Sequence, residues 1–215
     1  MQEPVRWNEQ STHAQTVLIT GGAGYIGSLL SRRLLGDGYS VRVLDSLLYG
    51  EDPILELRGQ PGYRLIIGDF RIPHVADLAL QGVDAVVHLG AIVGDPACSI
   101  DEMFTIDTNF HATRTLVKAC RRAGVQRFIF ASTCSVYGAS DGELDERSPL
   151  NPVSLYANTK IASESYLLSE ADDTFAPVIL RFGTAFGTSF RQRFDLVINL
   201  LAAKAAIDGV ITIHG

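Results

Sequence analysis

A tyrosine and a lysine stand four residues apart in the segment Tyr156-Ala157-Asn158-Thr159-Lys160, which opens a helical pattern. Residues at i and i+4 lie on one face of a helix, about 6 Å apart along its axis. Because a nearby ammonium stabilises a phenolate, we expect Lys160 to lower the pKa of Tyr156 from about 10 toward neutrality. A tyrosine with such a pKa can act as a general acid or base. Taken alone, the pair is not diagnostic, since Tyr-x-x-x-Lys occurs by chance in many helices.

Hydroxyl groups cluster in a second segment, Ser132-Thr133-Cys134-Ser135-Val136-Tyr137-Gly138, directly after a strand-like run. A hydroxyl at this position can hydrogen-bond a substrate hydroxyl or carbonyl. Asn109 lies in a helical pattern at 100–122, and its amide can bond backbone or water within the sheet. These side chains are candidates for the same site as the Tyr-Lys pair.

A third segment, Thr20-Gly21-Gly22-Ala23-Gly24-Tyr25-Ile26-Gly27, lies between a strand-like run and a helical pattern. Strand, glycine turn and helix in this order are typical of dinucleotide-binding sites. Gly24 would let the backbone approach a pyrophosphate at the helix N-terminus, where free N–H groups favour anions. Asp45 lies 18 residues after Gly27, behind a second strand-like run. An acid there can accept hydrogen bonds from an adenosine ribose, so the combination predicts a nucleotide site rather than a merely structural turn.

The elements that must position these groups alternate along the chain. Their apolar runs are continuous and β-branched, as in parallel strands that are buried on both faces. The strand-like runs are 16–19, 41–44, 63–67, 85–89, 128–131, 178–181 and 210–213. The helical patterns are 28–35, 74–81, 100–122, 154–171 and 194–207. The alternation predicts an α/β fold with a doubly wound parallel sheet, in one domain over residues 16–215.

Ligands of such sheets bind at the carboxyl ends of the strands. The small and polar residues that close the runs should therefore line one cleft. Besides the glycine turn, they are Asp45, Ser46, Asp69, Phe70, Gly90, Ala91, Ser132, Thr133, Phe182 and Gly183. Asp69 could reach an adenine amino group, and a helix N-cap or turn former is an equally good interpretation of this residue.

Composition argues against several other classes. The net charge of −6 over 215 residues disfavours nucleic-acid binding, which usually needs a basic face. No run reaches the roughly 18 apolar residues of a membrane helix. Three cysteines and five histidines show neither metal-ligand spacing nor a disulfide framework, so we expect no metal, reduced cysteines and a cytoplasmic location. His88 is expected in the core, and the polar residues 1–15 are expected to form a flexible N-terminal arm.

Taken together, the motifs resemble those of a known family. The glycine turn, Asp45, His88-Leu89-Gly90-Ala91, Asn109, the Ser132–Gly138 segment and Tyr156-x-x-x-Lys160 occur in the same order and spacing as in the extended short-chain dehydrogenase/reductases. Within these they are similar to the NAD-dependent nucleotide-sugar epimerase/dehydratase family. The resemblance covers residues 16–215 and implies a Rossmann fold, NAD as cofactor and a nucleotide-sugar substrate.

The resemblance also implies a role for each matching residue. Tyr156 would be the general base and acid at a sugar hydroxyl, Lys160 would hold the nicotinamide ribose, and Thr133 would match the catalytic Ser or Thr. The cofactor would be bound by Gly21, Gly24, Tyr25, Ile26, Gly27, Asp45, Ser46, Asp69, Phe70, Leu89, Gly90, Ala91, Asn109, Ser132, Tyr156, Lys160 and Phe182. We expect NAD rather than NADP, because a 2′-phosphate beside Asp45 would meet a like charge and no arginine follows closely.

Departures from the family's motifs bear on the reaction. The dehydratases carry Asp-Glu directly after the catalytic Thr, whereas this chain has Cys134 and Ser135. Val93 replaces a lysine common in UDP-galactose 4-epimerases, and Thr184 replaces an asparagine. We therefore expect an NAD-dependent epimerase that oxidises the sugar transiently to a keto-sugar. The alternatives are a nucleotide-sugar dehydrogenase, keto-reductase or dehydratase of this family, or a non-catalytic NAD-binding regulator.

Assembly and substrate handling are further expectations from the resemblance. It implies a homodimer through the helices at 100–122 and 154–171, with Leu116, Leu167 and Leu168 as candidate contacts. Family members continue well beyond the position of Gly215, with residues that bind the nucleotide diphosphate. We therefore expect the C-terminal substrate part to be absent, so that the chain binds cofactor but handles substrate poorly.

Overall fold

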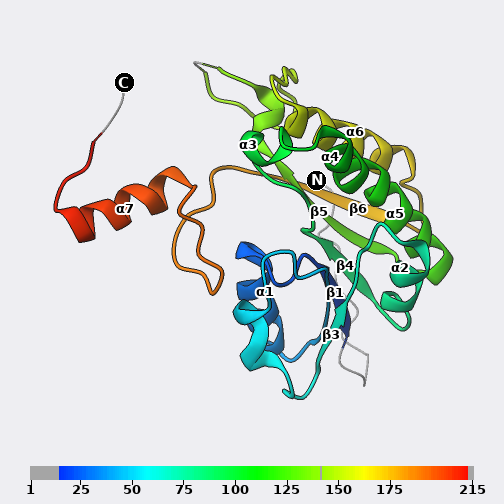
Figure 1. The fold of residues 1–215 in the computed structure, drawn as a ribbon. Coiled ribbons are helices and arrows are strands. Elements are labelled where there is room, and N and C mark those ends of the chain that lie inside the picture. Colours follow the sequence, from blue (N-terminus) through cyan, green and yellow to red (C-terminus); the bar gives the residue numbers. More distant parts are fainter. Residues whose placement is uncertain (1–14, 141, 213–215) are drawn as a thin grey trace, which may run out of the picture.

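A computed structural model describes residues 15–140 and 142–212, and this part is built on a parallel sheet of six strands (Figure 1). The strands are β1 (Thr16–Thr20), β2 (Ser40–Asp45), β3 (Tyr63–Ile67), β4 (Ala85–His88), β5 (Arg127–Thr133) and β6 (Ala176–Phe182). Their order is β3-β2-β1-β4-β5-β6, and each neighbouring pair is parallel. The strand order reverses between β1 and β4, which is where doubly wound sheets bind ligands. The predicted fold class is confirmed.

Helices connect the strands. They are α1 (Tyr25–Gly36), the 3₁₀-helix η1 (Asp52–Leu57), α2 (Pro73–Ala79), α3 (Asp95–Cys98), α4 (Glu102–Ile106), the π-helix η2 (Asp107–His111), α5 (Ala112–Ala123), the 3₁₀-helix η3 (Cys134–Tyr137), α6 (Leu155–Ser169) and α7 (Val197–Asp208). The elements α4, η2 and α5 follow one another without a break and form the helix predicted at 100–122. This helix ends at Gly124, whose φ of 73° lies in the left-handed region that glycine tolerates.

The sheet is covered on both faces, as Figure 1 shows, with α1 and η1 on one side and α2, α5 and α6 on the other. In β1 the side chains of Val17 and Ile19 join the cluster under α1, whereas Leu18 joins the cluster under α5. Successive residues of a strand point to opposite faces, so both must be apolar where both faces are buried. This explains the continuous apolar runs in the sequence.

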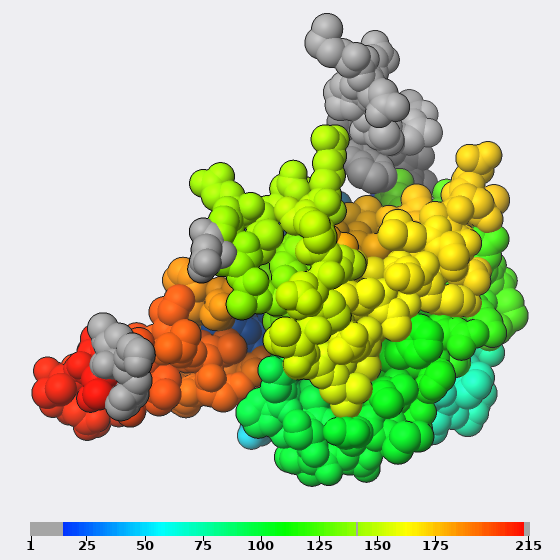
Figure 2. All heavy atoms as spheres, turned by 90° about the horizontal axis from the view of Figure 1, so that it is seen from above, coloured from blue at the N-terminus to red at the C-terminus, as the bar shows by residue number. Residues whose placement is uncertain are grey.

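Two C-terminal elements of the described part are less covered. On β6, Val178, Leu180 and Phe182 keep 51%, 38% and 37% of their surface exposed on one face of the sheet. Helix α7 extends away from the sheet in Figure 1, and Figure 2 shows it protruding from the body of the molecule. Asn199 is its one buried residue.

Some expectations need correction. Residues 210–212 form no strand, although their β-branched run predicted one, and Ile213 lies outside the described residues. The expected N-terminal arm lies outside them as well, apart from Gln15. Leu116 and Leu167 are fully buried in the core of this chain, so they are not surface contacts, whereas Leu168 is 62% exposed. Among the described residues, no helix has both the length and the apolar character needed to cross a membrane.

Candidate active site

The glycine turn packs tightly between β1 and the end of β4. A Cβ on Gly21 would lie 2.8 Å from the backbone of Gly90, and one on Gly27 would lie 2.6 Å from the Cα of Gly22. Helix α1 begins directly after Gly24, and no side chain caps its first N–H groups. Uncapped N–H groups at a helix N-terminus are a ready site for phosphate oxygens. The turn therefore fits the pyrophosphate of a dinucleotide.

Asp45 joins this turn to the end of β2. Its carboxylate accepts hydrogen bonds from the backbone N–H of Ala23 at 2.9 Å and of Leu47 at 2.8 Å. Leu47 has a φ of 56°, an uncommon value for a residue with a side chain. A carboxylate offers about four lone pairs, so two remain for ribose hydroxyls. Asp45 is thus oriented by the fold and can still accept bonds from a ligand.

These groups open onto a cavity of about 660 Å³ at the carboxyl ends of the strands. It brings together all the predicted site residues except Asn109. The predicted residues that line it are Gly21, Gly24, Tyr25, Ile26, Gly27, Asp45, Ser46, Asp69, Phe70, Leu89, Gly90, Ala91, Ser132, Thr133, Tyr156, Lys160 and Phe182.

Asn109 lies behind the cavity instead of in its wall. It is 1% exposed, and its amide exchanges two hydrogen bonds with the backbone of Ile92, at 2.8 Å and 2.9 Å. Its backbone carbonyl oxygen accepts from the hydroxyls of Thr113 and Ser163. The π-helical turn leaves this side chain facing the loop after β4, so Asn109 supports that loop, and the expectation of direct cofactor contact is corrected.

The neighbouring Thr108 was missed from the sequence. It lines the cavity and is 6% exposed, and its Oγ1 has no hydrogen-bond partner among the described residues. A buried hydroxyl without a partner is costly, so a ligand in the cavity would be a natural acceptor or donor. No sequence signal marks this residue, because a helical threonine commonly bonds the carbonyl of the preceding turn.

The predicted catalytic residues converge on one wall of the cavity. The Lys160 ammonium donates to the carbonyl of Ala131 at 2.8 Å, and its nitrogen lies 5.8 Å from the ring centroid of Tyr156. Thr133 is the last residue of β5, and its hydroxyl accepts a hydrogen bond from the backbone N–H of Ser135 at 3.1 Å. Helix α6 supplies the Tyr-Lys pair and β5 supplies Thr133, as the sequence predicted.

The predicted electrostatics of the pair are wrong. Burial raises the pKa of Tyr156 to about 12, although the charge of Arg193 and a hydrogen bond with Thr133 act in the opposite direction. Burial also lowers the pKa of Lys160 to about 8. In a low dielectric, desolvation disfavours every charged form, and burial is the largest cause of both shifts. The spacing of two residues on a helix does not reveal how strongly burial shifts their pKa values.

A buried ion pair holds α6 against the sheet below the catalytic residues. Glu164 is 3% exposed, accepts from the Ser132 hydroxyl, and pairs with the guanidinium of Arg181 at 2.6 Å. Arg181 also donates to the hydroxyl of Tyr137 at 2.9 Å. Ser132 lies between Thr133 and Ala131, whose carbonyl accepts from Lys160. The network therefore fixes the end of β5 that positions both Thr133 and Lys160.

The predicted Asp69 has a partner in the cavity, Arg71, that was not predicted. Asp69 accepts from the Nε of Arg71 at 2.8 Å and from its backbone N–H at 2.9 Å, so its carboxylate is shared with this arginine. Arg71 lies 4.4 Å from the ring centroid of Phe104. Arg191 and Arg193 line the cavity from the segment after β6.

The remaining histidine and cysteine expectations concern the core. His88 is 1% exposed and bonds the hydroxyls of Thr20 at 2.6 Å and Thr113 at 3.0 Å, as expected of a satisfied core histidine. Cys98 and Cys120 are buried free thiols, and Cys134 is an exposed one. Within residues 15–140 and 142–212, no group of His, Cys, Asp or Glu side chains could hold a metal ion.

The fold and site define a class: a dinucleotide-binding domain of the short-chain dehydrogenase/reductase type. The chain belongs to the NAD dependent epimerase/dehydratase family, whose model matches residues 17–215. It is 35% identical over 211 residues to YtcB of Bacillus subtilis, described as an uncharacterized UDP-glucose epimerase, covering 93% of this chain and 65% of the relative. It is 37% identical over 160 residues to a dTDP-glucose 4,6-dehydratase of Streptomyces griseus, covering 71% of this chain and 48% of that enzyme.

Solved structures agree. The UDP-glucuronic acid 4-epimerase of Bacillus cereus in complex with NAD is 31% identical, with a TM-score of 0.83 over 94% of this chain and 66% of that one. DesIV, a dTDP-glucose 4,6-dehydratase of Streptomyces venezuelae with NAD and TYD bound, is 33% identical, with a TM-score of 0.82 over 91% and 63%. The chain thus spans between about half and two thirds of the length of these relatives. The predicted family and its cofactor, NAD, are confirmed.

Proposed function

We propose that this chain carries the NAD site and catalytic residues of an enzyme that epimerises a nucleotide-activated sugar through a transient keto-sugar. One observation supports this most: Thr133, Tyr156 and Lys160 share a single cavity with the glycine turn and Asp45. The chain's residues fit NAD, because the first residues of α1, whose N–H groups no side chain caps, line the cavity together with Asp45.

In this proposal Tyr156 removes the proton from a sugar hydroxyl and later returns it, and Thr133 hydrogen-bonds the same oxygen. When bound, NAD⁺ supplies a hydride acceptor and donor for the sugar carbon, together with a positive charge in the cavity. A positive charge facing Tyr156 favours its phenolate and so opposes the effect of burial. Lys160, fixed by Ala131, holds a ribose hydroxyl and adds to the same field.

The choice between epimerase and dehydratase depends on two side chains beside Thr133. Elimination of water from a sugar needs an additional acid and base, and the family's dehydratases carry Asp-Glu at these positions. Here Cys134 and Ser135 line the cavity instead, and neither is a carboxylic acid. Relatives of both kinds match the chain, and these two residues favour the epimerase.

The test is to load the protein with NAD⁺ and to incubate it with UDP-glucose, UDP-glucuronic acid and dTDP-glucose in turn. Chromatography of the products distinguishes an epimer from a dehydrated keto-sugar. Absorbance of the reduced cofactor reveals a dehydrogenase, because only that enzyme accumulates it. Because we expect the chain to handle substrate poorly, the incubation is long and at high protein concentration. A dehydrated product, net reduction of NAD⁺ or no epimer under these conditions would each contradict the proposal.

A further inference from the structure

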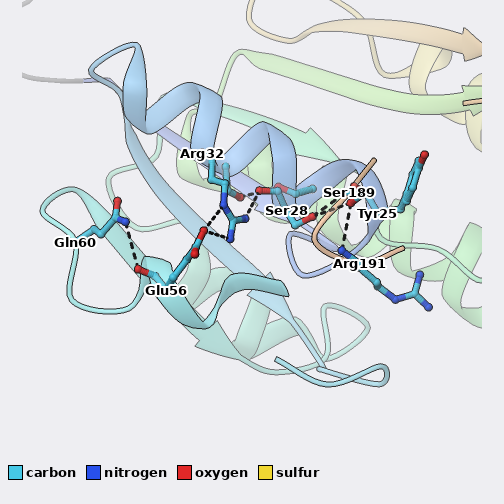
Figure 3. Close-up of polar contacts among 9 residues, drawn as sticks. Tyr25, Ser28, Arg32, Glu56, Gln60, Ser189 and Arg191 are labelled. Atoms are coloured by element: carbon cyan, nitrogen blue, oxygen red, sulfur yellow. Dashed lines mark hydrogen bonds and ion pairs between the residues drawn. The ribbon is translucent and has the colours of Figure 1, made fainter. Parts of the chain in front are cut away.

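The segment after β6 crosses the N-terminal turns of α1, and residues 187–193 of it are called the strap here. Figure 3 shows Ser189 and Arg191 of the strap beside Tyr25 and Ser28 of α1. The strap carries Arg191, and Arg193 ends it, and both line the cavity. The position of the strap therefore decides where two cations face a bound ligand.

Tyr25 makes two hydrogen bonds to the strap and one to Asn199 of α7. Its hydroxyl donates to the carbonyl of Gly187 at 2.7 Å and accepts from the Nδ2 of Asn199 at 3.1 Å. Its backbone carbonyl accepts from the hydroxyl of Ser189 at 2.7 Å. The side chain is 8% exposed, so these bonds are shielded from water.

Asn199 completes this contact from the first turn of α7. It is 6% exposed, accepts from the N–H of Gly187 at 2.8 Å and donates to the carbonyl of Arg193 at 3.0 Å. The two end residues of the strap, Gly187 and Arg193, thus both bond the side-chain amide of Asn199, which also donates to the Tyr25 hydroxyl. Because Asn199 is the one buried residue of α7, polar bonds rather than apolar packing dock this part of the chain.

Arg32 fixes the middle of the strap. Its guanidinium carbon lies 3.3 Å from the ring centroid of Phe190, and its nitrogens donate to the carbonyl of Ser28 at 2.7 Å and to Glu56 at 2.8 Å (Figure 3). Arg191 in turn lies over the ring of Tyr49, at 3.9 Å from its centroid. The strap has separate supports at its ends and its centre.

We propose that Tyr25 is a positioning residue, whose hydroxyl holds the strap and its two arginines in place against the dinucleotide turn. The backbone of Tyr25 begins α1 at the cavity, while its hydroxyl bonds Gly187 and Asn199, on either side of the two arginines. A single residue thereby sets the spacing between the cofactor site and the cations that would meet a nucleotide sugar. The inference rests on the proposed function only for the identity of that substrate.

The test removes one oxygen atom. Tyr25→Phe keeps the ring and the backbone, and Tyr39→Phe, at a side chain that is 37% exposed, is the matched control. Loss of two shielded hydrogen bonds should speed amide hydrogen exchange in the strap about tenfold, whereas Tyr39→Phe should leave strap exchange at the parent rate. Unchanged exchange in the strap of Tyr25→Phe would overturn the inference.

A second variant keeps the inference testable if Tyr25→Phe loosens the whole fold, which faster exchange in β1 and β4 would show. Asn199→Ala removes the partner amide from the other side. If the two residues act as one unit, the double variant should exchange hardly faster than either single variant. Fully additive effects on strap exchange would contradict a shared role.

Kinetics then connect the strap with substrate. Tyr25→Phe should raise KM for the nucleotide sugar several-fold, whereas the control Tyr39→Phe should leave KM at the parent value. An unchanged KM beside faster strap exchange would contradict the role of the strap in substrate binding. If the protein turns over no nucleotide sugar, the proposed function fails, and the exchange experiment alone decides the role of Tyr25.

Discussion

Tyr156 is the residue on which the proposed chemistry depends most. It lines the cavity with Thr133 and Lys160, and burial raises its pKa, so it holds its proton firmly until a positive charge enters. Tyr156→Phe should cut turnover by roughly 10² or more, the usual scale for a positioned acid–base group. Steady-state kinetics measure turnover, and an NAD titration measures cofactor affinity separately. Full activity with normal NAD affinity in this variant would contradict the mechanism.

Asp45 should decide which cofactor binds. Its carboxylate is oriented by two backbone N–H groups and keeps its negative charge toward the ribose site. A 2′-phosphate there would meet a like charge, so NAD should bind at least about tenfold more tightly than NADP. Calorimetry with both cofactors measures this difference, and Asp45→Asn should narrow it. Equal affinities in the parent protein would contradict this role.

His88 should make stability depend on pH. Burial lowers its pKa from 6.5 to about 3, and the charge of Lys160 acts in the same direction. The unfolded chain therefore binds a proton more readily than the folded one. The stabilisation is complete above pH 6.5 and is lost progressively as the pH falls from 6.5 toward 3. The slope contributed by this one group is at most about 1.4 kcal/mol per pH unit.

Denaturant unfolding across this pH range tests the contribution of His88. His88→Gln can still bond Thr20 or Thr113 but does not titrate, so its free energy of unfolding should fall less steeply between pH 6.5 and 4, a range inside the shift. The carboxylates titrate in both proteins, and the difference between the two slopes isolates the histidine. Identical slopes would show that His88 is protonated without cost.

At the scale of elements, the first turn of α1 packs against the glycine turn so closely that position 27 requires glycine. A Cβ on Gly27 would lie 2.6 Å from the Cα of Gly22, and backbone atoms cannot move aside as a flexible side chain would. Gly27→Ala should destabilise the protein by about 1–3 kcal/mol and weaken NAD binding. Gly36 ends the same helix with nothing within 4 Å of its Cβ position, so Gly36→Ala is the control. It should be neutral or stabilising by up to about 1 kcal/mol. Thermal unfolding with and without NAD compares them, and equal behaviour would contradict this packing argument.

Elements with two buried faces were predictable because their sequence carries the constraint. Strands β1 and β5 are continuous apolar runs, and no other placement would bury both sides. The run at 210–212 has the same composition but no strand beside it in the described part of the chain, and a strand forms only with a partner. Local composition cannot reveal the partner. The π-helical turn around Asn109 was equally hidden, since its insertion into a helix leaves no periodic signal.

Site residues were predictable where a motif fixes them locally. The glycine turn, Asp45 and the Tyr-Lys pair are set by their own strand or helix, and the topology brings them to one edge of the sheet. The positions of Thr108, Arg71 and Arg193 in the cavity depend on packing between distant segments. No motif around them in the sequence predicts that packing. The predicted lowering of the Tyr156 pKa was wrong for the same reason, since burial is a property of the assembled site.

At the scale of the molecule, a homodimer through α4–α5 and α6 stays a prediction, with revised contacts. Leu116 and Leu167 belong to the core, whereas Met103 and Leu168 are 68% and 62% exposed on these helices. Burying exposed apolar side chains between two copies would stabilise association. Sedimentation at micromolar concentration should show a dimer, and Leu168→Glu should shift it toward monomer by placing a charge in the contact. Ile207→Glu, on α7 and 82% exposed, is the matched control and should leave the dimer intact. A monomeric parent protein would contradict this interface. A dimer that dissociates with Ile207→Glu and survives Leu168→Glu would also contradict it, because the contact would then lie on α7.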